Sequence, residues 1–151
     1  LRLGSDQESW ALAGLAHDLD VEQTEDDFTR HGREAAALLR ERGAPDDVCH
    51  AVEAHNEENT GVKAETLMDI GLIAADQLSG LVTAAALVRP DRSLAGVQVK
   101  SLRKRFRETA FARGVDRGSI ARCEELGLSL EEFMALGLEA MQASAPELGL
   151  G

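Results

Sequence analysis

The spacing of apolar and polar positions predicts helices along the whole chain. An apolar run from Trp10 to Ala16 follows the capping box Ser5-Asp6-Gln7-Glu8, so a first helix is expected to reach about Asp18. Helical spacing predicts further helices over about residues 31–42, 45–55, 65–88, 97–113, 116–125 and 129–143. No window alternates with the period of two that a half-buried strand requires. The predicted fold class is therefore all-α, a helical bundle without a sheet.

The ends of these helices have recognisable signals. Gly43 is expected to end the second helix, and Pro45 to begin the third. Residues 56–63 show no periodicity and include a glycine, which predicts a loop. The next helix is apolar on nearly every side, so it should be central, and Pro90 ends it. Ser129-Leu130-Glu131-Glu132 is a second capping box and predicts the start of the last helix.

Length and composition favour one helical domain. The 151 residues predict a single domain over 1–151, with a core of about 1–88 and a C-terminal helical extension of about 89–151. Hydrophobic residues make up 44% of the chain but aromatic residues only 3%. The core must therefore consist of Leu, Ala, Val and Ile, which suits packed helices better than a β-sandwich.

The same sequence predicts a cytoplasmic protein. No stretch approaches 18 consecutive apolar residues, so no membrane partner is expected. The N-terminus has one basic residue before acidic and polar residues, unlike a signal peptide. Cys49 and Cys123 are isolated, without the spacing of a metal or redox motif, and are interpreted as reduced, buried thiols.

Charge is unevenly distributed. The net charge of −11 argues against broad binding of nucleic acid over the whole protein surface. From Arg89 to Arg117, however, nine basic residues face only three acidic ones, so this segment is a candidate for holding an anionic substrate. A solvated helix face explains the segment equally well. Helical spacing gathers four of the cations on one face, and these are Lys100, Arg103, Lys104 and Arg107.

Polar residues interrupt two apolar helices. The first helix presents His17 and Asp18 after seven apolar or small residues, and the long central helix contains Asp76. A buried carboxylate is costly unless a cation, a metal or strong donors accompany it. Ser79 lies one turn after Asp76 and either lines the same cavity or bonds back to its own helix, which we favour.

Two more histidines lie at predicted helix ends, where His31 opens one helix and His55 closes the next. Each alone is more typical of a surface or capping residue than of a ligand. Together with His17 and the carboxylates, they form a nitrogen and oxygen donor set that suits Mn, Fe, Co, Ni or Zn.

The segment Leu15-Ala16-His17-Asp18-Leu19-Asp20, followed by Ala75-Asp76 on a later helix, resembles the HD superfamily of metal-dependent phosphohydrolases. Segments 75–81, 100–104, 111–112 and 123–127 resemble small predicted bacterial hydrolases of that superfamily, so the resemblance covers almost the whole chain. It implies an HD-domain-like bundle that binds one or two divalent transition-metal ions.

The resemblance also implies a ligand set. His31 and His55 match the extra histidines of members that bind two metals, in which the HD aspartate bridges the ions. Asp18 would then bridge, with His17 and Asp76 on one metal and His31 and His55 on the other. His50 matches no ligand position.

One departure from the pattern concerns the first histidine of the family, which lies on a helix upstream of the HD pair. Only 16 residues precede His17, and none is histidine. Either an N-terminal helix is missing, as the initial Leu1 suggests, or the site has an open position for water or substrate. A truncated core would expose apolar surface, and self-association into a homo-oligomer would cover it.

The function implied by the resemblance is hydrolysis of a small anionic phosphorylated substrate, such as a phosphate ester or nucleotide. The metal would lower the pKa of a water toward neutrality for attack on phosphorus, with Asp18 as the catalytic residue. Lys100, Arg103, Lys104, Arg107 and Ser79 are the candidate substrate-binding residues. Two alternatives remain open: a di-iron oxygenase, or a catalytically impaired binding or interaction module.

Overall fold

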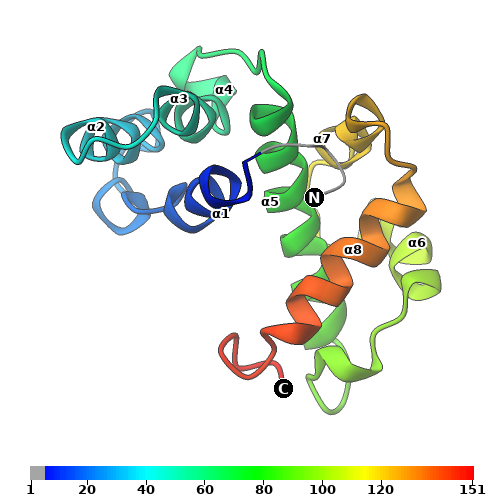
Figure 1. The fold of residues 1–151 in the computed structure, drawn as a ribbon. Coiled ribbons are helices and arrows are strands. Elements are labelled where there is room, and N and C mark those ends of the chain that lie inside the picture. Colours follow the sequence, from blue (N-terminus) through cyan, green and yellow to red (C-terminus); the bar gives the residue numbers. More distant parts are fainter. Residues whose placement is uncertain (1–5) are drawn as a thin grey trace. The chain divides into compact units, whose positions relative to one another are not determined.

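The computed structural model describes residues 6–151, and every regular element in that range is helical (Figure 1). The predicted all-α fold class is thus confirmed. The chain divides into two compact units, Leu1–Ile73 and Ala74–Gly151, and each has its own hydrophobic core. The assignment of one domain with a C-terminal extension from about residue 89 stays a prediction.

The first unit consists of short helices that pack through small side chains. Helix α3 packs against both α1 and α2, and α4 follows α3 directly. Its core contains Ala13, Ala36, Val48, Val52 and Leu72. The elements are α1 (Gln7–Ala16), η1 (Val21–Gln23), α2 (Arg33–Glu41), α3 (Asp46–Ala54), α4 (Glu57–Thr60) and the first turns of α5 (Leu67–Leu87).

A glycine allows a close contact between two helices of this unit. Trp10 of α1 packs directly on the backbone of Gly71 in α5. A Cβ atom at position 71 would lie 2.5 Å from Cζ3 of the indole, which is too close for any side chain. The indole of Trp10 thus packs against a bare stretch of backbone, next to the core of the first unit.

The start of α1 differs in detail from the predicted cap. Ser5 lies outside the described residues. Asp6 caps the helix, because its carboxylate accepts hydrogen bonds from the backbone N–H groups of Glu8 and Ser9 at 3.3 and 3.1 Å. An aspartate at this position also complements the positive end of the helix dipole.

The predicted loop over residues 56–63 is wrong in part, because α4 lies within it. The Thr60 hydroxyl donates to the carbonyls of Glu53 and Asn56, which holds this single turn onto the end of α3. Gly61 then ends the turn in the left-handed conformation (φ 72°). A four-residue helix has too few positions to show a hydrophobic period, so the sequence pattern missed it.

The second unit is built around the rest of α5. Helix α8 packs against α6, and its start is the predicted capping box: Ser129 N–H donates to the Glu132 carboxylate at 3.0 Å and Glu132 N–H donates to the Ser129 hydroxyl at 3.3 Å. The remaining elements are η2 (Leu94–Gly96), α6 (Val99–Arg107), α7 (Arg117–Ala121), η3 (Arg122–Leu126) and α8 (Leu130–Ala143). The core side chains include Leu81, Leu94, Leu102, Ile120 and Met134.

Helix α6 ends six residues before the predicted boundary at Arg113. The guanidinium of Arg117 reaches into the segment that follows α6. It replaces the backbone N–H donors that a continued helix would supply. It donates to the carbonyls of Ala112 at 2.6 Å and Val115 at 2.7 Å, and also to Phe111. These bonds satisfy backbone oxygens that an irregular turn would otherwise leave unpaired.

Helix α5 is long and apolar. Within the described residues it alone could cross a membrane by length and composition. Core helices of soluble proteins pass the same test, and 56% of its most apolar window is buried. Both cysteines are buried and free, in agreement with the prediction of reduced, buried thiols.

Candidate metal centre

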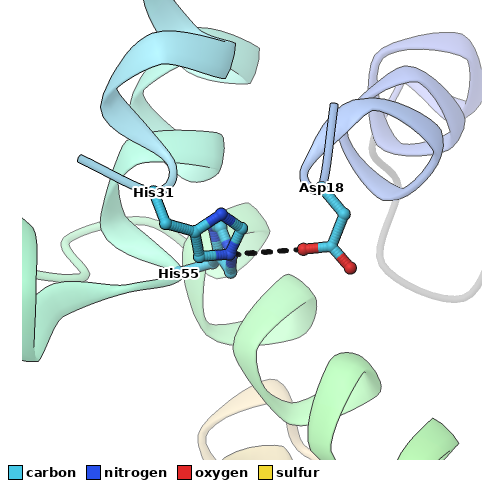
Figure 2. Close-up of side chains that lie close together, drawn as sticks. All are labelled: Asp18, His31 and His55. Carbon is cyan, nitrogen blue, oxygen red and sulfur yellow. Dashed lines mark hydrogen bonds and ion pairs between the residues drawn. The ribbon is translucent and has the colours of Figure 1, made fainter. Parts of the chain in front are cut away.

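Three side chains of the first unit converge on one point. Asp18 follows the end of α1, His31 precedes α2, and His55 ends α3, and their side chains point toward one another (Figure 2). Oδ1 of Asp18 lies 3.4 Å from Nε2 of His31 and 3.8 Å from Nε2 of His55. One ligand atom from each residue lies within 4.8 Å of the other two. Nitrogen and carboxylate oxygen at this spacing can hold a divalent metal ion.

His17 approaches the same carboxylate from the other side. Its Nε2 lies 3.2 Å from Oδ2 of Asp18, and its ring meets that of His55 edge to face with 5.1 Å between centroids. The two oxygens of Asp18 therefore face different histidines. The carboxylate thus contacts His17 through one oxygen and lies nearest His31 and His55 through the other.

The opposite ring nitrogen is occupied in all three histidines. Nδ1 of His17 donates to the carbonyl of Gly14 at 2.8 Å, and Nδ1 of His55 donates to the carbonyl of Val52 at 2.5 Å. Carbonyl oxygens only accept, so both of these nitrogens carry a proton. Nε2 is consequently the nitrogen left for a metal, which is the usual arrangement of histidine ligands.

A cation suits the space between these groups. Nε2 of His31 and Nε2 of His55 lie only 3.1 Å apart, and the carboxylate of Asp18 borders the same space. Lone pairs of neutral rings at that distance repel each other unless a cation or a proton lies between them. The donor set therefore fits a divalent metal ion, which Asp18, His31 and His55 would hold, with His17 beside the second oxygen of Asp18.

Burial and hydrogen bonding favour the protonation states that metal binding requires. Burial of the His55 ring lowers the pKa of this histidine, which favours the neutral form. The neighbouring His17 lowers the pKa of the Asp18 carboxyl, although partial burial opposes this effect. A neutral imidazole and an ionised carboxylate are the forms that coordinate metal.

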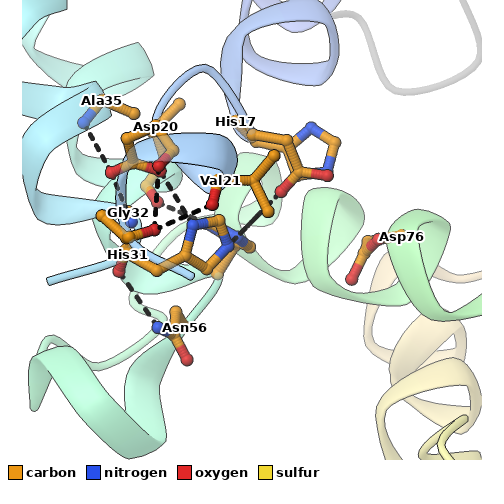
Figure 3. Close-up of polar contacts among 12 residues, drawn as sticks. His17, Asp20, Val21, His31, Gly32, Ala35, Asn56 and Asp76 are labelled. Carbon is orange, nitrogen blue, oxygen red and sulfur yellow. Dashed lines mark hydrogen bonds and ion pairs between the residues drawn. The ribbon is translucent and has the colours of Figure 1, made fainter. Parts of the chain in front are cut away.

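The sequence pattern missed Asp20, which lies behind His31. Its Oδ1 accepts the hydrogen bond from Nδ1 of His31 at 2.8 Å, and the whole residue is buried (Figure 3). Asn56 was missed as well: its amide donates to the carbonyls of Phe28 and His31 and so holds the His31 segment against α3. The position of Asp20 two residues after Asp18 was visible, but its burial was not.

The remaining candidate ligand, Asp76, lies on the part of α5 that belongs to the second unit. Its carboxylate is half-buried and accepts a hydrogen bond from the Gln77 amide at 3.0 Å. The Ser79 hydroxyl donates to the carbonyl of Asp76 at 2.7 Å, which is the back-bonding that the sequence favoured. Asp76 as a metal ligand and Ser79 as a substrate contact stay predictions.

The basic residues of α6 line a common hollow. Its volume is about 460 Å³, and Glu108 is the one acidic residue at its edge. Arg103 pairs with Glu131 at 2.6 Å and Lys104 lies 3.9 Å from Glu108, so part of the positive charge is compensated. The lining cations are Lys100, Arg103, Lys104 and Arg107.

His50 lies outside the cluster and belongs to a separate pair. Its Nδ1 is 3.1 Å from Oδ2 of Asp69, a fully buried carboxylate at the start of α5. That oxygen also accepts the backbone N–H groups of Glu65 and Thr66, each at 2.8 Å. Burial raises the pKa of Asp69, but these hydrogen bonds outweigh it and hold the pKa below its ordinary value.

The fold and this cluster define a helical domain with a candidate histidine and aspartate metal centre. A family model described as the HD domain matches residues 1–81, more than half of the chain. The chain belongs to the HD domain family. The matched region contains all four clustered residues and also Asp76. Searches of curated proteins and of solved structures found no match.

Proposed function

We propose that this protein is a metal-dependent phosphohydrolase that acts on a small phosphate ester or nucleotide. The observation that carries the proposal is the convergence of three histidine Nε2 atoms on the two oxygens of Asp18 within an HD domain. When bound, a divalent metal such as Mn, Fe, Co, Ni or Zn lowers the pKa of a coordinated water toward neutrality and neutralises phosphate oxygens.

Asp18 is the proposed catalytic residue because its carboxylate lies within 4 Å of Nε2 of all three clustered histidines. Its side chain is half exposed, whereas those of His31 and His55 are only 5% exposed. The buried rings therefore fix the site, and the exposed carboxylate marks the side from which water and substrate enter. With Asp76 as a fifth ligand, two metals would share Asp18, which is the two-ion form of the proposal.

The cations of α6 are proposed to bind the phosphate groups of the substrate. The hollow gathers four positive side chains, and an incoming phosphate would compete with Glu131 for Arg103. The double variant Lys100→Ala/Arg107→Ala should raise KM for a phosphorylated substrate and leave bound metal unchanged. Arg113→Ala, an exposed cation outside the hollow, is the matched control.

Turnover tests the proposal directly. The protein is freed of metal with a chelator, loaded with Mn²⁺, Co²⁺, Ni²⁺, Zn²⁺ or anaerobic Fe²⁺, and assayed for inorganic phosphate released from phosphomonoesters and nucleotides. We expect release that requires metal and is lost in Asp18→Ala but retained in His50→Ala. Oxygen consumption by the iron form without phosphate hydrolysis would favour a di-iron oxygenase. Tight ligand binding without either reaction would favour a binding module.

Two further proposals concern the cellular setting. The free, buried cysteines support a cytoplasmic location, where thiols stay reduced. Leu15 is 84% exposed, and Leu19 and Phe28 are about half exposed, which supports self-association that would cover exposed apolar side chains. Sedimentation of the wild type and of Leu15→Ser at several concentrations tests the second proposal: the variant should sediment as a smaller species.

A further inference from the structure

Asp20 has contacts that suit two different roles. The residue is 2% exposed, and its carboxylate bonds to three partners (Figure 3). Oδ2 accepts the backbone N–H groups of Gly32 at 2.9 Å and Ala35 at 2.8 Å. Oδ1 lies 2.8 Å from Nδ1 of His31. Oδ2 therefore accepts hydrogen bonds from the backbone, and Oδ1 contacts the imidazole ring.

The first role is structural. Gly32 is the N-cap of α2 and has no side chain to satisfy the first N–H groups of the helix. An N-cap side chain ordinarily binds the N–H group of the third residue of a helix, which is Ala35 in α2. Here Asp20, which is distant in sequence, binds that N–H group instead. Capping alone would explain why a carboxylate is buried here.

The second role concerns the proton on His31. Both oxygens of Asp20 act as acceptors in this arrangement, two backbone N–H groups on Oδ2 and the ring on Oδ1, so Nδ1 of His31 is the donor. Nε2 then faces Oδ1 of Asp18 at 3.4 Å and Nε2 of His55 at 3.1 Å. Carboxylates in this position behind a ligating histidine fix its tautomer and orientation.

We propose that Asp20 is a positioning residue that keeps the proton of His31 on Nδ1 and thereby presents Nε2 to the metal. This inference rests on the proposed metal site. It adds a residue that does not touch the metal but determines whether His31 can bind it.

The substitution Asp20→Asn separates the two roles. The two backbone N–H groups require the amide oxygen, so the amide NH₂ must face Nδ1 of His31. The reverse orientation would place NH₂ against two donors and lose both bonds. Nδ1 must then become an acceptor, which moves the ring proton to Nε2. The helix cap is retained, whereas the metal-binding nitrogen is blocked.

A matched control exists in the same unit. Asp69 is also fully buried, and it also accepts two backbone N–H groups and faces a histidine Nδ1, that of His50. Asp69→Asn makes the same chemical change outside the cluster. It controls for the loss of a buried charge and for any general loss of stability.

The experiment uses two measurements on wild type, Asp20→Asn and Asp69→Asn, each checked for helical content by circular dichroism. Nitrogen-15 spectra of the histidine rings in metal-free protein report which nitrogen of His31 carries a proton. Titration with Co²⁺ alone, followed by visible absorption, reports metal affinity. We expect Nδ1 of His31 to be protonated in wild type and unprotonated in Asp20→Asn, and affinity to fall about 10- to 100-fold in that variant. Asp69→Asn should keep the affinity within about twofold, because the two sites share no partner.

Two results would overturn the inference: a proton that stays on Nδ1 in Asp20→Asn, or a proton that moves while Co²⁺ affinity stays at the wild-type value. An equal loss of Co²⁺ affinity in Asp69→Asn would likewise show that Asp20 has only a structural role. Wild-type protein that binds no Co²⁺ would contradict the proposed metal site instead, and the ring spectra would still decide whether Asp20 sets the tautomer.

Discussion

Nε2 of His31 lies 3.1 Å from Nε2 of His55, although these residues are 24 positions apart and flank different helices. Both rings bond through Nδ1 to acceptors behind them, Asp20 for His31 and the carbonyl of Val52 for His55. Two such nitrogens are held close together only if something positive is to be placed between them. This pair, with Asp18 beside it, forms the candidate metal centre of the first unit.

Gly32 should be required for this centre. It has φ +85°, and a Cβ atom there would lie 3.0 Å from the carbonyl oxygen of Val52 and 3.3 Å from Cε1 of His55. Gly32→Ala should therefore cost more than the roughly 1–2 kcal/mol of a positive φ and also displace the His55 ring. Metal affinity should fall together with stability.

Gly43→Ala is the control for that prediction. Gly43 has φ +77° but no atom within 4 Å of the added Cβ, so only the backbone cost applies. Chemical unfolding and Co²⁺ titration of both variants separate the effects. Equal metal affinity in Gly32→Ala and wild type would show that the contact with His55 is unimportant.

Asp69 should contribute a pH-dependent part of stability. Its pKa is lowered in the folded state, so the unfolded state, with a pKa near about 3.9, binds protons first as the pH falls. The contribution is complete above the unfolded pKa and is lost as the pH falls through the folded pKa. Asp69→Asn should cost about 1–3 kcal/mol at pH 7.

Denaturant unfolding between pH 3 and pH 7 measures this effect. The difference between wild type and Asp69→Asn should shrink as the pH falls below about 4, where the Asp69 carboxylate of the unfolded wild type begins to take up a proton. A difference that stays constant over the whole range would mean that the charge of Asp69 does not stabilise the start of α5.

Arg117 should not be replaceable by lysine. Its planar guanidinium bonds to several carbonyls of the turn after α6, whereas an ammonium group cannot reach them together. Arg117→Lys should destabilise the second unit by about 2–4 kcal/mol. Arg122→Lys, which affects a single surface pair with Glu125, should change stability by less than about 0.5 kcal/mol. Similar losses in both variants, measured by denaturant unfolding, would contradict this role.

Much of the fold was predictable because its signals are local. The capping box at Ser129, the apolar length of α5 and the absence of period-two segments all depend on neighbours in sequence. The turn after α6 was not predictable, because its carbonyls are satisfied by Arg117, a residue beyond the segment itself. The helical spacing of apolar residues continues in the sequence after Arg107, although the helix itself ends there.

The candidate site was likewise predictable only in part. The HD pair and the placement of His31 and His55 at helix ends indicated which residues could meet, and the structure brings His17, Asp18, His31 and His55 together. Asp20 was missed because its significance depends on burial and on Gly32 and Ala35, which follow it by 12 and 15 positions. An aspartate in a polar stretch carries no sign of that burial.

Metal bound after exhaustive dialysis tests the central claim most directly. Wild type, His31→Ala, His55→Ala, His17→Ala and the control His50→Ala are loaded with Co²⁺ or Mn²⁺, dialysed and analysed for metal per chain, with the fold checked by circular dichroism. We expect His31→Ala and His55→Ala each to lower the metal content, and His50→Ala to match wild type. If neither His31→Ala nor His55→Ala lowers it while His17→Ala does, these two histidines are not ligands and the site holds at most one metal.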